Sequence, residues 1–238
     1  MREQLQQAIA VAASLGRRVP HGPVIALITG ACVGAYLLVG AALVTATSPS
    51  PAPPAGDLPQ IGMMLPEPVI KSTFVIRRTT EDTEGAFVEM DVLMNAGGGP
   101  GMLGTHRHPG AEERLQVLEG VVTIRVDGTD HAVTAGESVR IPGGVSHSIR
   151  NESDRFALVR GRFEPAAHMD TYFVQVHRAG GFGRVGTFRM AALATRFRDQ
   201  YAPGPPPLWF SRAATLLIAP SARVAGMPTH YAPGPAPD

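Results

Sequence analysis

The sequence predicts an all-β domain that closes into a small barrel, with one transmembrane helix before it and two helices after it. From residue 69 onward, short runs of β-branched and apolar residues alternate with Gly, Pro and Asp-Gly, which is typical of a β-sandwich or barrel. Residues 24–47 carry no charged side chain. Beyond residue 186 the apolar residues recur at helical spacing.

The uncharged stretch is long enough to cross a bilayer, which takes roughly 20 residues. Arg2, Arg17 and Arg18 precede it and no basic residue closely follows it, so the positive-inside rule places residues 1–23 in the cytoplasm. The alternative is a cleaved signal peptide, whose apolar region usually spans only about 7–15 residues. We therefore expect a single-pass membrane protein whose barrel lies outside the cytoplasm.

Residues 48–68 begin with a run rich in proline, SPSPAPPAGDLP, which disfavours both helix and central strand. We expect an extended, semi-rigid linker between the membrane helix and the folded domain.

The barrel is expected over residues 69–180, and Asp127-Gly128 predicts a tight hairpin inside it. The predicted strands are residues 74–77, 86–94, 114–118, 121–126, 132–133, 138–141, 147–150, 156–163 and 172–176.

Residues 181–238 are expected to form a helical extension. The first helix follows Gly186 and shows an amphipathic pattern. The second covers 208–219, is too short to span a membrane, and should end or kink at Pro220. The apolar residues of the first helix are Met190, Leu193, Ala194, Phe197 and Tyr201. Trp209 and Phe210 are expected to cover the outside of the barrel; a lid, a homodimer contact and a membrane-resting patch are the alternatives.

Two histidines, His106 and His108, stand two residues apart, so on a strand both imidazoles point to one face. That geometry lets both rings reach one metal ion.

Two adjacent acids follow, and strand parity distinguishes them. Glu113 shares its face with Leu115 and Val117, whereas Glu112 shares its face with Arg114. Because the apolar face points into a barrel, Glu113 is the predicted ligand and Glu112 faces solvent.

The chain resembles the cupin superfamily in two motifs. In the first, G-x5-H-x-H-x3,4-E-x6-G, the sequence supplies His106, His108, Glu113 and Gly120, while the leading glycine is displaced by one residue to Gly101. The second, G-x5-P-x-G-x2-H-x3-N, is matched in full by Gly136, Pro142, Gly144, His147 and Asn151. The resemblance covers residues 69–176 and implies a jelly-roll-like cupin barrel.

The resemblance also implies one divalent transition metal held by His106, His108, Glu113 and His147. Imidazoles and one carboxylate suit Fe(II), Mn, Ni, Co, Cu or Zn, and they leave about two open positions on an octahedral ion. The sequence does not select among these metals.

Three functions are compatible with such a site. The first is a dioxygenase-like metalloenzyme acting on a small organic molecule, with Glu113 as ligand and proton acceptor. The second is a non-catalytic module that binds or senses a small ligand, and the third is a storage-type structural protein.

Composition argues against several other kinds of partner and site. A net charge of +1 gives no basis for nucleic-acid binding. Cys32 is the single cysteine, which excludes an intramolecular disulfide and a cysteine-based zinc cluster. Only one lysine, Lys71, stands against many arginines, which weakly indicates a bacterial GC-rich genome.

Overall fold

The computed structural model describes residues 21–47, 58–99, 104–182, 185–204, 208–225 and 227. The N-terminal residues 1–20, the proline-rich residues 48–57 and the start of the first histidine motif at 100–103 lie outside the described residues. Expectations for those segments remain predictions.

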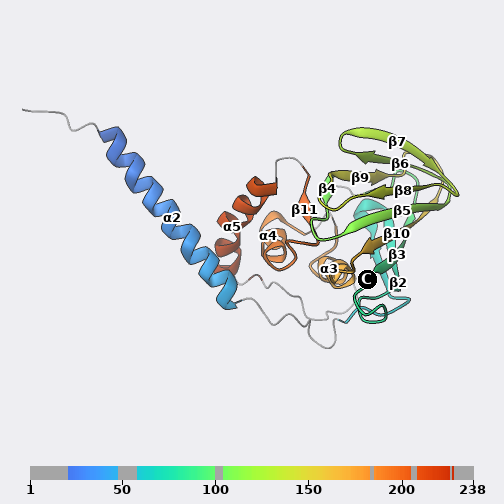
Figure 1. The fold of residues 1–238 in the computed structure, drawn as a ribbon, viewed down its shortest axis with the longest axis horizontal. Coiled ribbons are helices and arrows are strands. Elements are labelled where there is room, and N and C mark those ends of the chain that lie inside the picture. The colour runs from blue at the N-terminus through green and yellow to red at the C-terminus, as the bar shows by residue number, and fades with distance from the viewer. Residues whose placement is uncertain are drawn as a thin grey trace, which may run out of the picture. The chain divides into compact units, whose positions relative to one another are not determined.

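Two antiparallel sheets form the barrel, as the spacing of the strand-like runs predicted (Figure 1). The larger sheet has the order β1-β2-β3-β10-β5-β8 and the smaller the order β11-β4-β9-β6-β7. The strands are β1 Met64–Glu67, β2 Ser72–Arg78, β3 Val88–Met94, β4 His106–Arg107, β5 Glu112–Glu119, β6 Val121–Val126, β7 Thr129–Thr134, β8 Ser138–Ile141, β9 His147–Arg150, β10 Ala157–Glu164 and β11 Ala202–Pro203.

Tight turns fix the register of the strands. Asp127 and Gly128 join β6 to β7 with φ of 47° and 86°, the left-handed pair that a two-residue hairpin requires. The predicted hairpin is therefore confirmed. Gly144, with φ of 79°, turns the chain after Pro142 and delivers it to β9.

Strand β1 and the 3-10 helix Pro68–Ile70 fall largely within residues 48–68, where we expected extended linker. Met64 pairs with Val75, so β1 extends the larger sheet at its edge.

Buried side chains form two clusters. One fills the barrel between the sheets and includes Val117, Ile124 and Val159. The other lies at the end of the barrel where helices α3 Met169–Arg178 and α4 Thr187–Arg196 pack, and it combines strand residues with aromatic residues from the helices. Figure 1 shows α3, α4 and α5 Leu208–Val224 on that one side of the strands.

Two expectations for the C-terminal part were wrong, and a third is decided in part. Residues 172–176 belong to helix α3 rather than to a strand; their sequence, YFVQV, is rich in aromatic and β-branched residues, which favour a strand equally well. Helix α5 does not end at Pro220 but continues to Val224, since a proline removes one backbone hydrogen bond without ending every helix, and the alternative of a kink at Pro220 remains a prediction. Trp209 and Phe210 do not cover the barrel but are 71% and 49% exposed.

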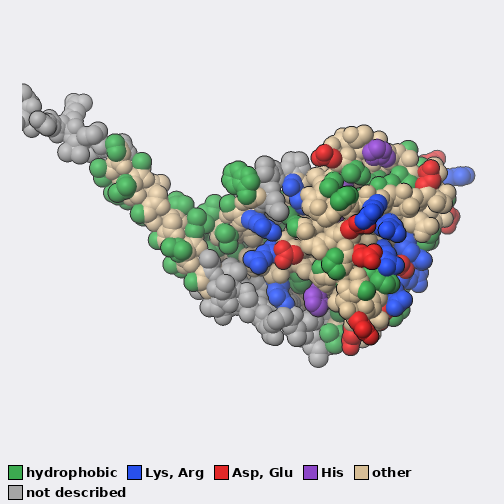
Figure 2. Space-filling view, in the orientation of Figure 1, with side chains coloured by type: hydrophobic (Ala, Val, Ile, Leu, Met, Phe, Trp, Pro, Cys, Tyr) green, Lys and Arg blue, Asp and Glu red, His purple; other side chains and the backbone are tan. Residues whose placement is uncertain are grey.

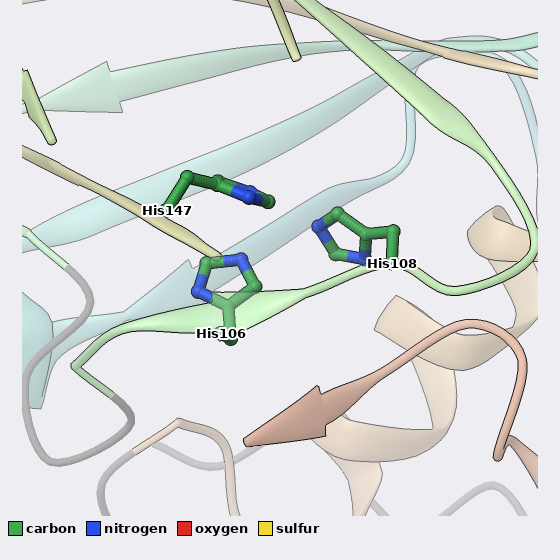
Figure 3. Close-up of side chains that lie close together, drawn as sticks. All are labelled: His106, His108 and His147. Carbon is green, nitrogen blue, oxygen red and sulfur yellow. The ribbon is translucent and has the colours of Figure 1, made fainter. Parts of the chain in front are cut away.

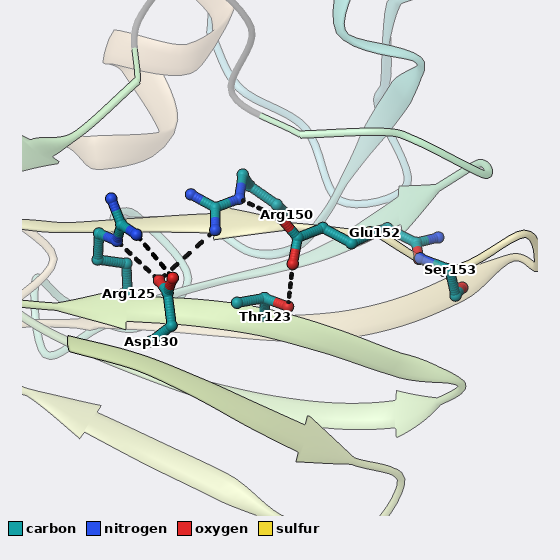
Figure 4. Close-up of polar contacts among 7 residues, drawn as sticks. Thr123, Arg125, Asp130, Arg150, Glu152 and Ser153 are labelled. Carbon is teal, nitrogen blue, oxygen red and sulfur yellow. Dashed lines mark hydrogen bonds and ion pairs between the residues drawn. The ribbon is translucent and has the colours of Figure 1, made fainter. Parts of the chain in front are cut away.

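The outer surface of the smaller sheet carries an exposed ion-pair network (Figure 4). Arg125 on β6 contacts Asp130 on β7 at 2.6 Å, and Arg150 on β9 reaches the same carboxylate at 3.5 Å. Thr123 donates to Glu152 at 2.6 Å. These contacts tie three neighbouring strands together on the side facing solvent.

Helix α2, His21–Thr47, is the one described helix long and apolar enough to cross a membrane. Its most apolar window, Pro23–Gly40, has a mean hydropathy of 2.0 and is almost entirely exposed. Figure 2 shows hydrophobic side chains along its length. The helix fits either a membrane span or a signal sequence.

Candidate metal centre

Three histidines meet inside the barrel, and their imidazoles face one another (Figure 3). His106 opens β4 and His147 opens β9, and the two are register partners across the smaller sheet. His108 follows β4 by one residue. One ring nitrogen from each histidine lies within 4.8 Å of the other two, which places the triad to hold one ion.

Backbone carbonyls orient all three rings through Nδ1. The distances are 3.3 Å from His106 to Gly104 O, 2.5 Å from His108 to Gln200 O and 3.0 Å from His147 to Val145 O. A carbonyl accepts only, so Nδ1 must carry the proton and Nε2 keeps its lone pair. A hydrogen bond from the other ring nitrogen to a backbone carbonyl is typical of histidines that bind a metal.

The two adjacent acids face opposite sides, as strand parity predicted. Glu113 is buried with Leu115 and Val117, and its Oε2 lies 2.7 Å from His147 Nε2 and 3.5 Å from His108 Nε2. Glu112 instead accepts a hydrogen bond from Arg140 Nε at 2.6 Å on the outer face. The structure thus brings all four predicted residues together, while the coordination of a metal by Glu113 remains a prediction.

Buried polar atoms without a hydrogen bond show whether these residues fit a metal ion. Among the described residues, Glu113 Oε2 and His147 Nε2 are buried without a hydrogen bond of acceptable geometry, although they lie only 2.7 Å apart. Burying such atoms unpaired costs about 1–3 kcal/mol each. Three imidazoles and a carboxylate are also the donors that transition metals prefer, so the residues present fit a divalent ion.

The pKa values show that the site favours positive charge beside the carboxylate. Burial raises the pKa of Glu113, but His147 and the other two histidines outweigh it and lower that pKa to about 2. Burial lowers the pKa of His147, yet Glu113 more than compensates and the net pKa is raised. A bound cation would supply the same kind of positive charge beside the carboxylate.

The other two histidines stay neutral. Burial, followed by the charges of His147 and His108, lowers the pKa of His106 well below its usual value. Burial also lowers the pKa of His108 to about 4, against the opposing effect of Glu113. Neutral imidazoles at neutral pH are the form that binds a metal.

The triad and Glu113 open into a cavity of about 80 Å³. This volume holds several waters or a small ligand, since one water needs roughly 10–15 Å³ by the same kind of measure. The walls come from both sheets and from the segment after β10, which supplies Tyr172, Phe173, Phe182 and Tyr201.

Sequence reasoning missed the cavity residues contributed by α3 and by the segment that follows α4. Tyr201 stacks on His106 with ring centroids 5.6 Å apart, and Gln200 supplies the carbonyl that orients His108. Both lie more than 90 residues beyond these histidines in the chain. In the sequence, Tyr201 belonged only to the apolar face of a predicted helix, and Tyr172 and Phe173 only to a predicted strand. Their spacing in the chain does not relate them to the histidine motifs.

Asn151, the last residue of the second motif, has a structural role. Its buried amide donates to the carbonyls of Met94, Asn95 and Arg155, and its Oδ1 accepts from Ser153. The side chain thereby joins the end of β3 to the loop after β9. It is not part of the histidine group that could hold a metal.

Three other described histidines do not belong to the triad. His131 and His168 are exposed, and His177 pairs with buried Glu67 at 2.8 Å.

Comparison with known proteins gives one family match. Residues 92–159 match the family profile described as a cupin domain, and this range contains all three histidines and Glu113. No curated protein matches the chain.

Similar solved structures include KdgF from Halomonas sp., which is 18% identical, with 40% of this chain and 79% of that chain covered and a TM-score of 0.35. A predicted oxalate decarboxylase from Thermotoga maritima is 17% identical, with 45% and 98% covered and a TM-score of 0.39. An RmlC-like cupin from Shewanella frigidimarina is 19% identical, with 49% and 93% covered and a TM-score of 0.35.

Proposed function

Since the chain contains a cupin domain at residues 92–159, we propose that it is a membrane-anchored, metal-dependent oxidoreductase, dioxygenase-like, that acts on a small organic molecule. The observation that carries the proposal is the convergence of three Nδ1-anchored histidines and one buried, unpaired carboxylate on a single cavity. Such a site has donors for an ion and room for a ligand beside it.

In this proposal His106, His108, Glu113 and His147 hold one divalent transition metal. When bound, the ion supplies Lewis-acid chemistry and, for iron, manganese or copper, redox chemistry. Glu113 contributes the negative charge of the site and is the one carboxylate among the described residues that line the cavity. It is therefore the candidate proton acceptor as well as a ligand.

The protein around these residues limits their contact with bulk water. The cavity walls are mostly apolar, and the histidines and Glu113 are largely buried. A low-dielectric wall strengthens each electrostatic contact inside the site and protects reactive species from hydrolysis.

Metal analysis followed by oxygen uptake tests the proposal. The full chain, purified in detergent, should contain about one transition-metal ion per chain and should consume oxygen with one class of small substrate. A phenol and thiol panel, run with and without a chelator, provides the measurement. Metal and ligand binding without turnover would instead assign the chain to the alternative, a non-catalytic binding or sensing module.

The anchoring part of the proposal rests on α2 and on the basic residues that precede it. An uncleaved span would hold the N-terminus in the cytoplasm and the barrel outside. A reporter that works only outside the cytoplasm, fused after Asp238, should be active, and the purified chain should keep its N-terminal residues. Activity from a cytoplasm-only reporter would reverse the orientation, and loss of residues 1–46 would indicate a signal peptide.

A further inference from the structure

Helix α5 presents a stripe of large apolar side chains to solvent. The exposed fractions are 71% for Trp209, 49% for Phe210, 36% for Leu216 and 43% for Leu217. Positions 209 and 216, and likewise 210 and 217, are two helical turns apart, so the four side chains share one face of α5. Exposed apolar side chains gathered on one face mark a surface that contacts something else.

A hollow of about 160 Å³ adjoins this stripe, between α4 and α5. Arg198 and Arg212 line the hollow, and Leu216 belongs both to the hollow and to the stripe. The two guanidinium groups lie 3.9 and 3.6 Å from one carboxylate, that of Asp199. Because all three charged side chains are at least half exposed, these ion pairs are weak, and a phosphate group can compete for both arginines.

Charge is distributed unevenly along the chain. Residues 181–238 carry six arginines and two aspartates, whereas residues 48–180 carry 12 basic and 17 acidic residues. Figure 2 shows basic side chains over α4, next to hydrophobic side chains over α5. An apolar helix face flanked by arginines is typical of a helix that lies in the headgroup region of an anionic bilayer.

The chain itself would hold this surface near a membrane. Residues 48–57 separate the end of α2 at Thr47 from the described part of the barrel domain, which begins at residue 58. A fully extended chain of this length reaches at most about 40 Å. A spanning α2 would therefore keep the helices close to lipid headgroups and raise their effective concentration there.

We infer that the stripe and the adjoining hollow form a docking surface for anionic phospholipids, called here the α5 surface. The apolar side chains enter the boundary between headgroups and acyl chains, while Arg198 and Arg212 bind lipid phosphates. The inference goes beyond the proposed function, because docking needs neither a bound metal nor turnover. The proposed membrane span serves only as a tether, and a domain released from α2 keeps the α5 surface.

The fluorescence of Trp209 reports on this surface alone, because Trp209 is the single tryptophan of the chain. The full chain is reconstituted into vesicles of phosphatidylcholine, with or without phosphatidylglycerol, and each lipid mixture is made with and without brominated acyl chains. In anionic vesicles the brominated chains should quench Trp209 and acrylamide should not. In phosphatidylcholine alone the quenching by brominated chains should be weaker, and in anionic vesicles added salt should reduce it.

Two outcomes of this measurement would overturn the inference. The first is a Trp209 that acrylamide still quenches in anionic vesicles. The second is protection from acrylamide without quenching by brominated chains, which would show that a second copy of the chain or another protein segment covers the stripe.

Charge variants test the hollow. Arg198→Gln combined with Arg212→Gln should lower the ratio of docked to undocked chains about tenfold or more, since one arginine at an anionic surface contributes roughly fivefold. Asp199→Asn should raise that ratio. Arg125→Gln combined with Arg150→Gln is the matched control, because it removes the same charge from the outer face of the smaller sheet and should leave the ratio unchanged. An equal fall in both double variants would overturn the assignment of the hollow.

A charge placed in the stripe tests its entry into the bilayer. Leu216→Glu should abolish quenching by brominated chains, because burying a carboxylate in an apolar layer is costly. Val121→Glu on β6 is the matched control, since Val121 is also 36% exposed, and it should be quenched like the wild type. Circular dichroism checks that both variants are folded. Retained quenching in folded Leu216→Glu would overturn the inference.

The same readout separates docking from the proposed function. Quenching of Trp209 by anionic brominated vesicles supports docking even where no oxygen uptake is found, a failure that counts against the proposed enzyme alone. A chain that has lost residues 1–46 is mixed with preformed anionic vesicles, and Trp209 should again be quenched. An active enzyme whose Trp209 is never quenched would keep the proposed function and overturn the docking surface.

Discussion

The barrel strands and the segment after β10 supply different parts of one site. Strands β4, β5 and β9, with the residue after β4, place the three histidines and Glu113, all within 42 positions of chain counted from His106 to His147 inclusive. One end of the barrel is closed by α3, α4 and the residues that follow α4. This segment supplies aromatic side chains to the cavity wall and the backbone carbonyl that orients His108. The candidate ligands are therefore placed by the segment that contains the motifs, while the cavity beside them is shaped by residues far away in the chain.

The largest expected effect is loss of a ligand on the barrel side. His147→Ala should reduce the metal content from about one ion per chain to a minor fraction, because one of the donors disappears. Strand content by circular dichroism should persist, since the apolar core between the sheets does not depend on the ion. Metal content is measured by elemental analysis of the detergent-purified chain.

Glu112→Gln is the control for that experiment, because Glu112 faces Arg140 on the outside and should not affect the metal. Equal loss of metal from Glu112→Gln and Glu113→Gln would break the assignment of Glu113 to the site.

Truncating an aromatic side chain of the cavity wall should lower the stability of the fold more than the metal content. Phe173→Ala removes a buried ring that contacts Phe74, Phe163 and Phe182, and should lower the free energy of unfolding by about 3–5 kcal/mol. Metal content at low temperature should be retained. Chemical denaturation gives the first quantity and elemental analysis the second.

The exposed Phe188 on α4 is the matched control for the wall, since it is 51% exposed. Phe188→Ala should change stability by less than about 0.5 kcal/mol. Loss of metal in Phe173→Ala from otherwise folded protein would mean that the wall also holds the ligands in place.

A smaller effect is expected from Asp91, a carboxylate on β3 that links three strands of the larger sheet. It accepts from Arg77 Nε at 2.6 Å and from Arg160 Nε at 2.8 Å. Burial raises its pKa, but the two arginines outweigh burial and the net pKa is lowered. A depressed pKa contributes stability above the unfolded value of about 3.9, and that contribution is lost as the pH falls through the folded pKa.

Asp91→Asn should therefore cost about 1–2 kcal/mol at pH 7, a value reduced for the partly exposed arginines. The difference between the variant and the wild type should shrink below about pH 4. Thermal melting at a series of pH values provides the measurement, and a difference that grows toward acid pH would contradict the sign.

The smallest effect is expected from the exposed network on the other sheet. Asp130→Asn removes the contacts to Arg125 and Arg150, but solvent and salt screen these charges. The change in melting temperature should be smaller than that of Asp91→Asn and should vanish in high salt. A larger change would show that this network, rather than the buried carboxylate, holds the barrel strands together.

The barrel, the hairpin at Asp127-Gly128 and, through the cupin motifs, the grouping of His106, His108, Glu113 and His147 could all be predicted from the sequence. Turn residues, alternation along β5 and motif spacing act over a few residues, so the printed chain carries them directly. The tertiary structure alone decided that residues 172–176 are helical, that Gln200 orients His108 and that Tyr172 and Tyr201 form the cavity wall. The run at residues 172–176 is rich in aromatic and β-branched residues that suit a strand as well as a helix. A contact across more than 90 residues depends on how the chain packs rather than on any local preference.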